Sequence, residues 1–328
     1  MKAIVNTQYG SPDVLRMLEV AKPTPKENEV LIKIHAVAVN AADWHLLKAD
    51  PFLVRLQFGL FKPKYTILGA DIAGRVEAVG QNVKKLKVGD DVFGNSSSSG
   101  WGGYAEYAAV REDVLVLKPA NITFEEAAAV PMAAVTALLG LKEGKIQQGQ
   151  TVLINGASGG VGTFAIQIAK VLGAEVTAVC STRNVELARS LGADHVIDYT
   201  QEDFTQNGRR YDLIFDAVGN RSVSDLQRAL SPHGICAVVG FTSLSLMFQV
   251  IVLGAWVSKT GREKIGLMDT VKPGQKDLSF IKSLLEAGKV VPVIDRCYPL
   301  PETAEAIRYL EQGRARGKVV ITVDGAKA

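Results

Sequence analysis

A glycine-rich segment at residues 155–162 constrains the fold more than any other feature of the chain. It reads NGASGGVG, it follows the apolar run TVLI at 151–154, and helical periodicity begins directly after it. Where such a turn joins a strand to a helix, backbone N–H groups and the positive end of the helix can meet a diphosphate. The position of the glycines therefore predicts a dinucleotide-binding unit.

The segments that follow the turn repeat the same alternation of strand and helix. Strand-like runs at 176–180, 196–197, 213–215 and 236–239 are separated by segments of helical character. Regular alternation of this kind predicts a doubly wound parallel sheet flanked by helices. Near the C-terminus we expect a helix from about residue 277 to 288, a strand at 291–294, a helix at 303–312 and a final strand at 318–323.

The turn itself supplies the first set of candidate binding residues. Glycine is needed because a β-carbon would block the close approach of phosphates, and the last glycine lets the helix pack on the sheet. The alternative is a glycine turn without a ligand. The residues expected to bind the diphosphate are Gly156, Ser158, Gly159, Gly160, Val161 and Gly162.

The end of the second strand bears on the choice of nucleotide. A site that prefers NAD usually carries a carboxylate there, whereas this strand is followed by Ser181, Thr182 and Arg183. The two hydroxyls can bond a 2′-phosphate and the guanidinium can neutralise it, so the sequence favours NADPH. Alternatively, Arg183 is a solvated loop charge and Ser181 or Asn184 caps the next helix.

Length and composition indicate a two-domain globular protein with a small-molecule ligand. A chain of 328 residues exceeds the size at which one hydrophobic core stops growing, and β-branched runs at 30–34 and 72–80 predict a barrel-like domain in the first third. The net charge of +3 arises from 37 basic and 34 acidic residues that are scattered along the chain. We therefore expect no nucleic-acid partner.

The sequence also predicts a cytoplasmic protein that does not enter a membrane. The most apolar segment, 244–257, is shorter than the roughly 20 residues of a membrane-spanning helix, and we expect it to be buried core or a subunit contact. The N-terminus lacks the pattern of an export signal. The three cysteines, Cys180, Cys236 and Cys297, are widely separated and suit a reducing compartment.

Several motifs together resemble the zinc-free quinone oxidoreductase and enone reductase branch of the medium-chain dehydrogenases/reductases. They are GASGGVG at 156–162, LGAD at 191–194, VIDY at 196–199 and GKVV at 317–320. The resemblance spans nearly the whole chain. It implies a GroES-like, β-barrel-type catalytic domain at 1–125, completed by 292–328, a Rossmann NADP(H)-binding domain at 126–291, and a homodimer.

The resemblance also implies that no metal is bound. Zinc-dependent relatives place a cysteine where this chain has Asn40, a His-Glu pair where it has Ala70 and Asp71, and a third ligand near Met132. Three cysteines cannot form a four-cysteine zinc loop, and the four histidines are not at ligand spacings.

Without a metal, the acceptor must be polarised by hydrogen bonds, which suits a small hydrophobic quinone or α,β-unsaturated carbonyl whose developing charge is delocalised. The resemblance makes Asn40, Asp43 and Thr136 the candidates for orienting cofactor and substrate. Alternatively, Asn40 or Asp43 caps the short helix that follows, and Thr136 bonds its own helix backbone. No residue stands out as a general acid.

Four further residues are carried over to the cofactor site: Tyr199, Gly219, Phe241 and Lys318. Tyr199 could equally be a half-buried strand aromatic, and Phe241 could belong to the core. The apolar segments 52–61 and 244–256 either line the substrate pocket or serve as core or a dimer seam. Rival functions are a metal-free, NADPH-dependent alcohol or aldehyde reductase and a non-catalytic NADPH-binding protein.

Overall fold

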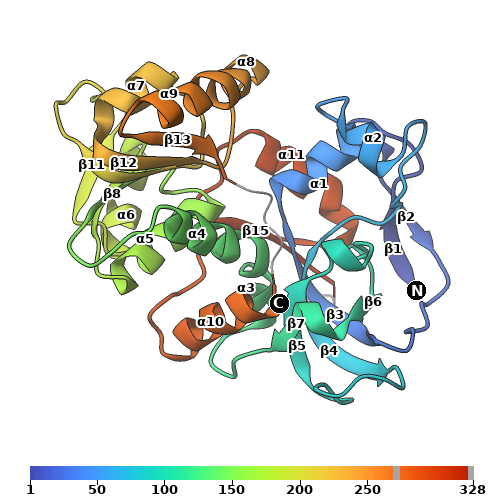
Figure 1. Cartoon of the computed structure of the whole chain (residues 1–328). Coiled ribbons are helices and arrows are strands. Elements are labelled where there is room, and N and C mark those ends of the chain that lie inside the picture. Colours follow the sequence, from blue (N-terminus) through green and yellow to red (C-terminus); the bar gives the residue numbers. More distant parts are fainter. Residues whose placement is uncertain (269–273, 324–328) are drawn as a thin grey trace. The chain divides into compact units, whose positions relative to one another are not determined.

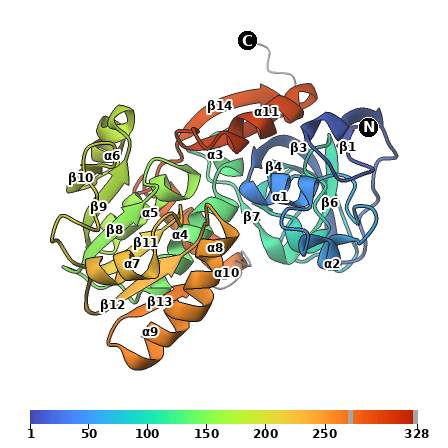
Figure 2. The ribbon, with the colours of Figure 1, turned by 90° about the horizontal axis from the view of Figure 1, so that it is seen from above.

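The computed structural model describes residues 1–268 and 274–323 and divides into two compact units. Among these residues, unit 1 comprises 1–132, 274–288 and 292–323, and unit 2 comprises 133–268 and 289–291. The domain boundaries expected from the sequence stay a prediction. Figure 1 labels most of the helices and strands of both units, and Figure 2 adds labels for β9, β10 and β14.

Unit 2 is built on a six-stranded sheet in the order β10-β9-β8-β11-β12-β13, and every pair of neighbours is parallel. The strands are β8 (Thr151–Asn155), β9 (Glu175–Cys180), β10 (His195–Asp198), β11 (Tyr211–Asp216), β12 (Leu230–Val238) and β13 (Lys264–Leu267). The order reverses direction at β8, which is the strand before the glycine turn (Figure 2). The predicted doubly wound parallel sheet is confirmed, and ligands of such sheets bind at this reversal.

Helices connect most of the strands as the alternation predicts, but among the described residues none lies between β10 and β11, and α4 (Pro131–Glu143) precedes β8. The other helices are α5 (Gly160–Val171), α6 (Val185–Ser190), α7 (Val223–Ala229), α8 (Leu244–Gln249) and α9 (Ala255–Thr260), with a 3₁₀ turn η4 (Thr182–Asn184) and a π-helical turn η5 (Val250–Gly254). Helix α5 lies against β8 and β9 and buries most of its length. The core of the sheet contains Leu153, Val179 and Ile214, which come from three neighbouring strands.

Unit 1 is mainly β-structure, as the β-branched runs predict. Its seven-stranded sheet comprises β3 (Glu29–Val39), β4 (Asp71–Val79), β5 (Asp91–Asn95), β6 (Tyr107–Arg111), β7 (Leu115–Leu117), β14 (Ile294–Pro299) and β15 (Lys318–Thr322). The long strand β3 pairs with β15, β4 and β6, so the C-terminal segment completes the sheet begun by the first third of the chain. This arrangement explains why β15 can bring Lys318 to the end of β3.

Smaller elements surround that sheet. They are the hairpin of β1 (Lys2–Val5) and β2 (Arg16–Glu19), the helices α1 (Ala41–Lys48), α2 (Val54–Phe58), α3 (Phe124–Ala128), α10 (Gln275–Glu286) and α11 (Thr303–Glu311), and the 3₁₀ turns η1 (Pro12–Val14), η2 (Ser97–Ser99), η3 (Glu112–Val114) and η6 (Leu300–Glu302). Helix α11 covers β15, and α3 packs on β3 and β4.

One prediction about an individual segment was wrong, and for a second segment one of the alternatives left open by the sequence is excluded. The strand expected at 291–294 begins only at Ile294. The backbone of Val291 is instead bonded by the Gln167 side chain, because the Val291 N–H donates to Gln167 Oε1 at 2.8 Å and Gln167 Nε2 donates to the Val291 carbonyl at 2.9 Å. The apolar segment 244–256 is not core. Only Val250, Gly254 and Val257 of α8, η5 and α9 turn inward, which leaves Leu244, Phe248 and Trp256 more than half exposed.

None of the helices in the described ranges is long and apolar enough to cross a membrane.

Candidate functional site

The glycine turn joins β8 to α5, and its three spaced glycines serve different purposes. Gly156 has a φ of 83°, which residues with a side chain rarely adopt. A β-carbon at Gly162 would lie 2.2 Å from the carbonyl oxygen of Gly156, so the fold itself requires glycine there. At Gly159 the nearest atom to an added β-carbon is 3.4 Å away. The face of the turn at Gly159 is therefore open, and protein atoms do not fill it.

The first turn of α5 supplies donors to this open face. Gly159 is the N-cap, and the N–H groups of Gly160, Val161 and Gly162 have no carbonyl partner within the helix. The positive end of the helix dipole lies at the same place. A diphosphate fits both features, because it is negatively charged and accepts hydrogen bonds without donating any.

The serine of the turn is linked to the end of β9 by a buried asparagine. Asn184 Nδ2 donates to Ser158 Oγ at 2.9 Å and to Ser181 Oγ at 3.2 Å. Asn184 is 4% exposed, and its Oδ1 is buried without a partner. From the sequence, Asn184 is predicted only as a possible helix cap. In the structure its side chain makes no capping bond. Its contacts could not be inferred from spacing, because Ser158 lies 26 residues away along the chain.

Thr182 has a different partner from the one expected. Its hydroxyl lies 2.5 Å from Asp198 Oδ2 and donates to it, so its proton already has an acceptor. The hydrogen bond from Thr182 lowers the pKa of Asp198, which keeps this carboxylate ionised. The absence of a carboxylate at the end of β9 was read correctly from the sequence. However, Asp198 at the end of neighbouring β10 reaches the same place, because β10 pairs with β9 in register Asp198 to Cys180.

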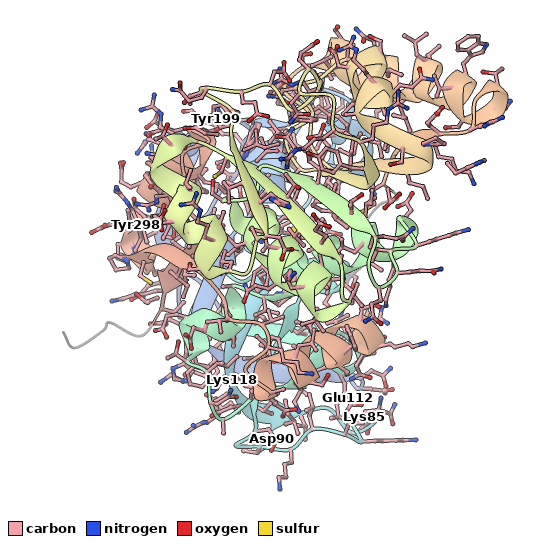
Figure 3. All side chains as sticks on the ribbon, turned by 90° about the vertical axis from the view of Figure 1, so that its left-hand side faces the viewer. Lys85, Asp90, Glu112, Lys118, Tyr199 and Tyr298 are labelled. Carbon is pink, nitrogen blue, oxygen red and sulfur yellow. The ribbon has the colours of Figure 1, made fainter. Side chains whose placement is uncertain are left out.

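The aromatic candidates on unit 2 lie at strand ends and are exposed. Tyr199, labelled in Figure 3, follows β10 and is 56% exposed. Phe241 follows β12 and is 41% exposed, so the alternative that it belongs to the core was wrong. Both side chains are available to a ligand at the carboxyl ends of the strands.

A buried carboxylate that sequence reasoning missed shapes the turn after β11. Asp216 Oδ1 accepts from Asn155 Nδ2 at 2.8 Å, from Val218 N–H at 3.0 Å and from Gly219 N–H at 2.9 Å. Burial raises the pKa of Asp216, and these hydrogen bonds oppose that shift. Gly219 has a φ of 63°, and a β-carbon there would lie 1.9 Å from the Gly240 carbonyl oxygen. Asp216 and Gly219 therefore fix the end of β11 beside the end of β8.

Unit 1 contains a second buried polar cluster, where four segments meet. Lys318 Nζ donates to Asn40 Oδ1 at 2.5 Å and to the Val39 carbonyl at 3.3 Å. Asn40 Nδ2 donates to Asp71 Oδ2 at 3.0 Å, and Asn95 Nδ2 donates to Asp71 Oδ1 at 2.7 Å. The Met132 N–H also donates to Asp71. We call Lys318, Asn40, Asp71, Asn95 and Asp43 the Lys318 cluster.

Burial dominates the electrostatics of the Lys318 cluster. It raises the pKa of Asp71, while the nearby Lys318 ammonium opposes that shift. It lowers the pKa of Lys318, and the carboxylates of Asp71 and Asp43 oppose that shift in turn. Burial raises the pKa of Asp43 to about 7, although Oδ2 accepts from Asn40 N–H at 2.8 Å and Oδ1 from Gly69 N–H at 3.0 Å. The cluster thus balances two buried carboxyls against one buried ammonium.

These contacts show how unit 1 uses the residues expected to orient substrate and cofactor. Asp43 is fully buried, and its carboxylate bonds the N-cap residue of α1, as the capping alternative predicts. Asn40 is 7% exposed and uses its amide within the cluster. Lys318 is 4% exposed, and its ammonium donates to Asn40 Oδ1. Thr136 lies in unit 2, buried in α4. A direct role of any of them toward a ligand stays a prediction.

The donor set of the Lys318 cluster does not suit a metal. Asn40 and Asp71, which stand at two of the ligand positions of zinc-dependent relatives, already bond each other, and a buried ammonium lies against the Asn40 oxygen. Within 1–268 and 274–323, no group of three or more His, Cys, Asp or Glu residues could hold a metal ion. The histidines have other contacts: His35 stacks on Phe124, His45 on Trp44, and His195 bonds Glu175.

Comparison with known proteins supports this description of both units. Residues 26–120 match the model of the alcohol dehydrogenase GroES-like domain, and residues 191–321 match the model of a zinc-binding dehydrogenase. The chain is 39% identical to a 2-methylene-furan-3-one reductase of Solanum lycopersicum, over 98% of this chain and 79% of that protein. It is 37% identical to the NADPH-dependent alkenal/one oxidoreductase, chloroplastic, of Arabidopsis thaliana, with the same coverage.

A solved structure agrees over nearly the whole chain. The quinone oxidoreductase from Coxiella burnetii superposes with a TM-score of 0.86 at 31% identity, covering 98% of this chain and 99% of that one. The sequence resemblance is therefore confirmed by independent similarities in sequence and in structure. The chain belongs to the medium-chain dehydrogenases/reductases, in the branch of quinone oxidoreductases and enone reductases, and is an oxidoreductase.

Proposed function

We propose that the protein reduces a quinone or an α,β-unsaturated carbonyl with NADPH and without a metal. The observation that carries the proposal is the open space in front of Gly159, at the start of α5, where the first N–H groups of the helix have no carbonyl partner within the helix. The names of similar proteins, an enone reductase, an alkenal/one oxidoreductase and a quinone oxidoreductase, support the substrate class.

The residues of unit 2 divide the binding of the nucleotide among them. Gly160, Val161 and Gly162 bind the diphosphate through their N–H groups, Ser158 and Ser181 add hydroxyl donors, and Tyr199 and Phe241 offer exposed aromatic faces. When bound, a reduced nicotinamide supplies the hydride. The turn at Gly219, fixed by Asp216, borders the end of β11 where the nicotinamide half is expected.

Arg183 decides between NADPH and NADH in this proposal. It lies exposed in η4, directly after Ser181, where a 2′-phosphate would need a positive partner. The ionised Asp198 opposes that preference, and Arg183 offsets it. We expect Arg183→Ala to weaken NADPH binding by about tenfold to a hundredfold, the effect of one lost charge-assisted pair, and NADH binding by less than about threefold.

Titration calorimetry with each nucleotide measures this effect. Arg189→Ala is the matched control, because Arg189 is also exposed and lies in the next helix, away from the end of β9. Equal losses of NADPH and NADH affinity in Arg183→Ala would assign Arg183 a general electrostatic role. Such a result would contradict the proposal that Arg183 determines the preference for NADPH.

The proposal of a metal-free reaction rests on the Lys318 cluster. A cation placed between Asn40 and Asp71 would face the Lys318 ammonium and displace two hydrogen bonds that these side chains already make. The cluster instead neutralises its own charge and stiffens the end of β3, from which α1 begins.

An acceptor panel tests the reaction. NADPH oxidation should be seen with quinones or enones, should be weak or absent with simple aldehydes, and should be unchanged after incubation with a chelator. Turnover confined to aldehydes would favour the alcohol or aldehyde reductase, and loss of turnover with chelator would contradict the metal-free reaction. Stoichiometric NADPH binding without oxidation by any acceptor would favour the non-catalytic binding protein.

We also propose a homodimer. The exposed apolar residues Leu244, Phe248 and Trp256 lie on the segment that packs beside β13, and β12 is the only strand partner of β13 in the described part of the chain. An open strand edge next to an apolar surface suits pairing with a second copy.

The remaining expectations from the sequence are kept as proposals. The domains are 1–125 with 292–328 and 126–291. A cytoplasmic location is supported by free cysteines, of which Cys180 and Cys236 are buried, whereas the Arabidopsis thaliana relative is named chloroplastic.

A further inference from the structure

The hydrogen bonds of Asn184 determine how the hydroxyl groups of Ser158 and Ser181, beside the glycine turn, are used as donors and acceptors. A serine oxygen can accept two hydrogen bonds but can donate only one. Ser158 Oγ and Ser181 Oγ each accept a hydrogen from Asn184 Nδ2, and neither donates to an acceptor among residues 1–268 and 274–323. The hydroxyl hydrogens therefore need acceptors from elsewhere.

The orientation of the Asn184 amide follows from its burial. In the observed orientation, the Asn184 amide donates both of its N–H groups to the two serines, and its carbonyl oxygen Oδ1 has no partner. The reversed amide would leave two buried N–H groups without partners, and an unpaired buried N–H is the rarer and costlier arrangement. Asn184 is only 4% exposed and its Oδ1 is buried, so water does not relieve either case.

The two serines stand at two different parts of the nucleotide site. Ser158 lies in the turn that meets the diphosphate, and Ser181 follows β9, where the adenosine ribose and its 2′-phosphate are expected. A phosphate group accepts hydrogen bonds at every oxygen, whereas a ribose hydroxyl also brings a hydrogen of its own. Two O–H donors that have no acceptor among the described residues therefore match phosphates at both places.

We propose that Asn184 is a positioning residue that holds the hydroxyls of Ser158 and Ser181 as donors toward the phosphates of the nucleotide. The inference rests on the proposed function, because it assumes that the glycine turn binds NADPH. Asn184 thereby links the diphosphate contact to the 2′-phosphate contact and contributes to the preference for NADPH without touching the nucleotide.

Removal of the amide tests this directly. In Asn184→Ala the serine hydroxyls are free to rotate, so NADPH affinity should fall about tenfold, the effect of one hydrogen bond to a charged group. NADH affinity should fall by less, roughly threefold, because only the bond from Ser158 to the diphosphate is affected. Titration calorimetry of both nucleotides measures the ratio, and a residue that only supported the fold would lower both affinities equally.

A double-mutant cycle shows whether Asn184 acts through the serines. In a protein that already carries Ser158→Ala and Ser181→Ala, adding Asn184→Ala should change NADPH affinity by less than about twofold. A further tenfold loss in that background, or equal losses of NADPH and NADH in the single variant, would overturn the proposal. If Asn184→Ala does not fold, as judged by circular dichroism, the pair Ser158→Ala and Ser181→Ala alone must lower the NADPH to NADH preference, and an unchanged preference overturns the proposal.

An isosteric variant tests the direction of the bonds. Asn184→Asp replaces two donors by acceptors that take the serine hydrogens, so it should weaken NADPH more than Asn184→Ala does. Gln206→Glu is the charge control, because it adds one negative charge at an exposed position of the same unit. Tighter NADPH binding by Asn184→Asp than by Asn184→Ala would contradict the assigned orientation. Failure of the unmodified protein to bind either nucleotide would overturn the proposed function itself.

Discussion

Replacing Gly159 by valine is expected to abolish NADPH binding while the protein remains folded. Its backbone has φ −81° and ψ 176°, an extended conformation that valine adopts readily, and an added β-carbon meets no protein atom closer than 3.4 Å. The branched side chain instead fills the space in front of the first turn of α5. We expect affinity for NADPH and NADH to fall at least about a hundredfold, with a change in unfolding free energy below about 1 kcal/mol.

The neighbouring glycines provide the controls for this experiment. Gly162→Val should lose stability as well as binding, because its β-carbon would lie 2.2 Å from the Gly156 carbonyl oxygen. Gly266→Val in β13 has open space around it and should bind NADPH as the unmodified protein does. Calorimetry gives the affinities and circular dichroism the stability. A Gly159→Val protein that binds NADPH normally would remove the diphosphate from this turn.

Replacing Lys318 by methionine is expected to cause the largest loss of stability. The change removes the ammonium that opposes the burial-induced rise in the pKa of Asp71, so the buried carboxylate loses its stabilising charge. It also leaves Asn40 Oδ1 without its donor. Removing one partner of a buried charge network typically costs about 3–5 kcal/mol, and we expect a loss of about 3 kcal/mol because Asn40 lies between the two charges. Urea unfolding followed by the fluorescence of Trp44 and the buried Trp101, both in unit 1, measures it.

A second substitution separates charge from packing. In Lys318→Met combined with Asp71→Asn, the carboxylate nearest to the lost ammonium is also removed and only the Asp43 carboxyl remains in the cluster, so at least half of the lost stability should return. Lys87→Met, at an exposed lysine of unit 1, should change stability by less than about 0.5 kcal/mol. If the double variant is as unstable as the single one, the Lys318 cluster stabilises unit 1 by packing and not by charge.

The stability of the Lys318 cluster depends on pH. The pKa of Asp71 is raised in the folded state, so stability from this group is greatest below its unfolded pKa and decreases as pH rises through the folded pKa. Without the Lys318 ammonium the folded pKa of Asp71 rises further. The difference in stability between the unmodified protein and Lys318→Met should therefore be smaller at pH 5 than at pH 8.

The parallel sheet and its glycine turn could be predicted because their signals are local. The glycines at 156–162 directly follow a strand and begin a helix, so one stretch of sequence contains both the motif and its context. The unequal roles of Gly159 and Gly162 were partly visible in the same way, since close helix packing requires the last glycine.

The contacts that could not be predicted join residues from distant segments. Asn184 reaches Ser158 across β8 and β9, Asp198 reaches Thr182 from a neighbouring strand, and Lys318 reaches Asn40 because β15 pairs with β3. The order of the strands in the sheets determines which of these residues come into contact, and residue spacing along the sequence does not reveal that order. The sequence left the apolar segment 244–256 open as pocket lining, core or a dimer seam for a related reason: composition indicates that a helix is apolar, but it does not indicate whether another surface covers it.

Hydrogen exchange with and without NADPH shows whether the nucleotide binds at the start of α5. Bound diphosphate would engage the N–H groups at the start of α5, so the peptide covering 156–163 should exchange much more slowly in the presence of NADPH. The peptide covering 181–184 should be protected more by NADPH than by NADH. NADPH binding without protection at 156–163 would show that the nucleotide binds elsewhere and would contradict the account.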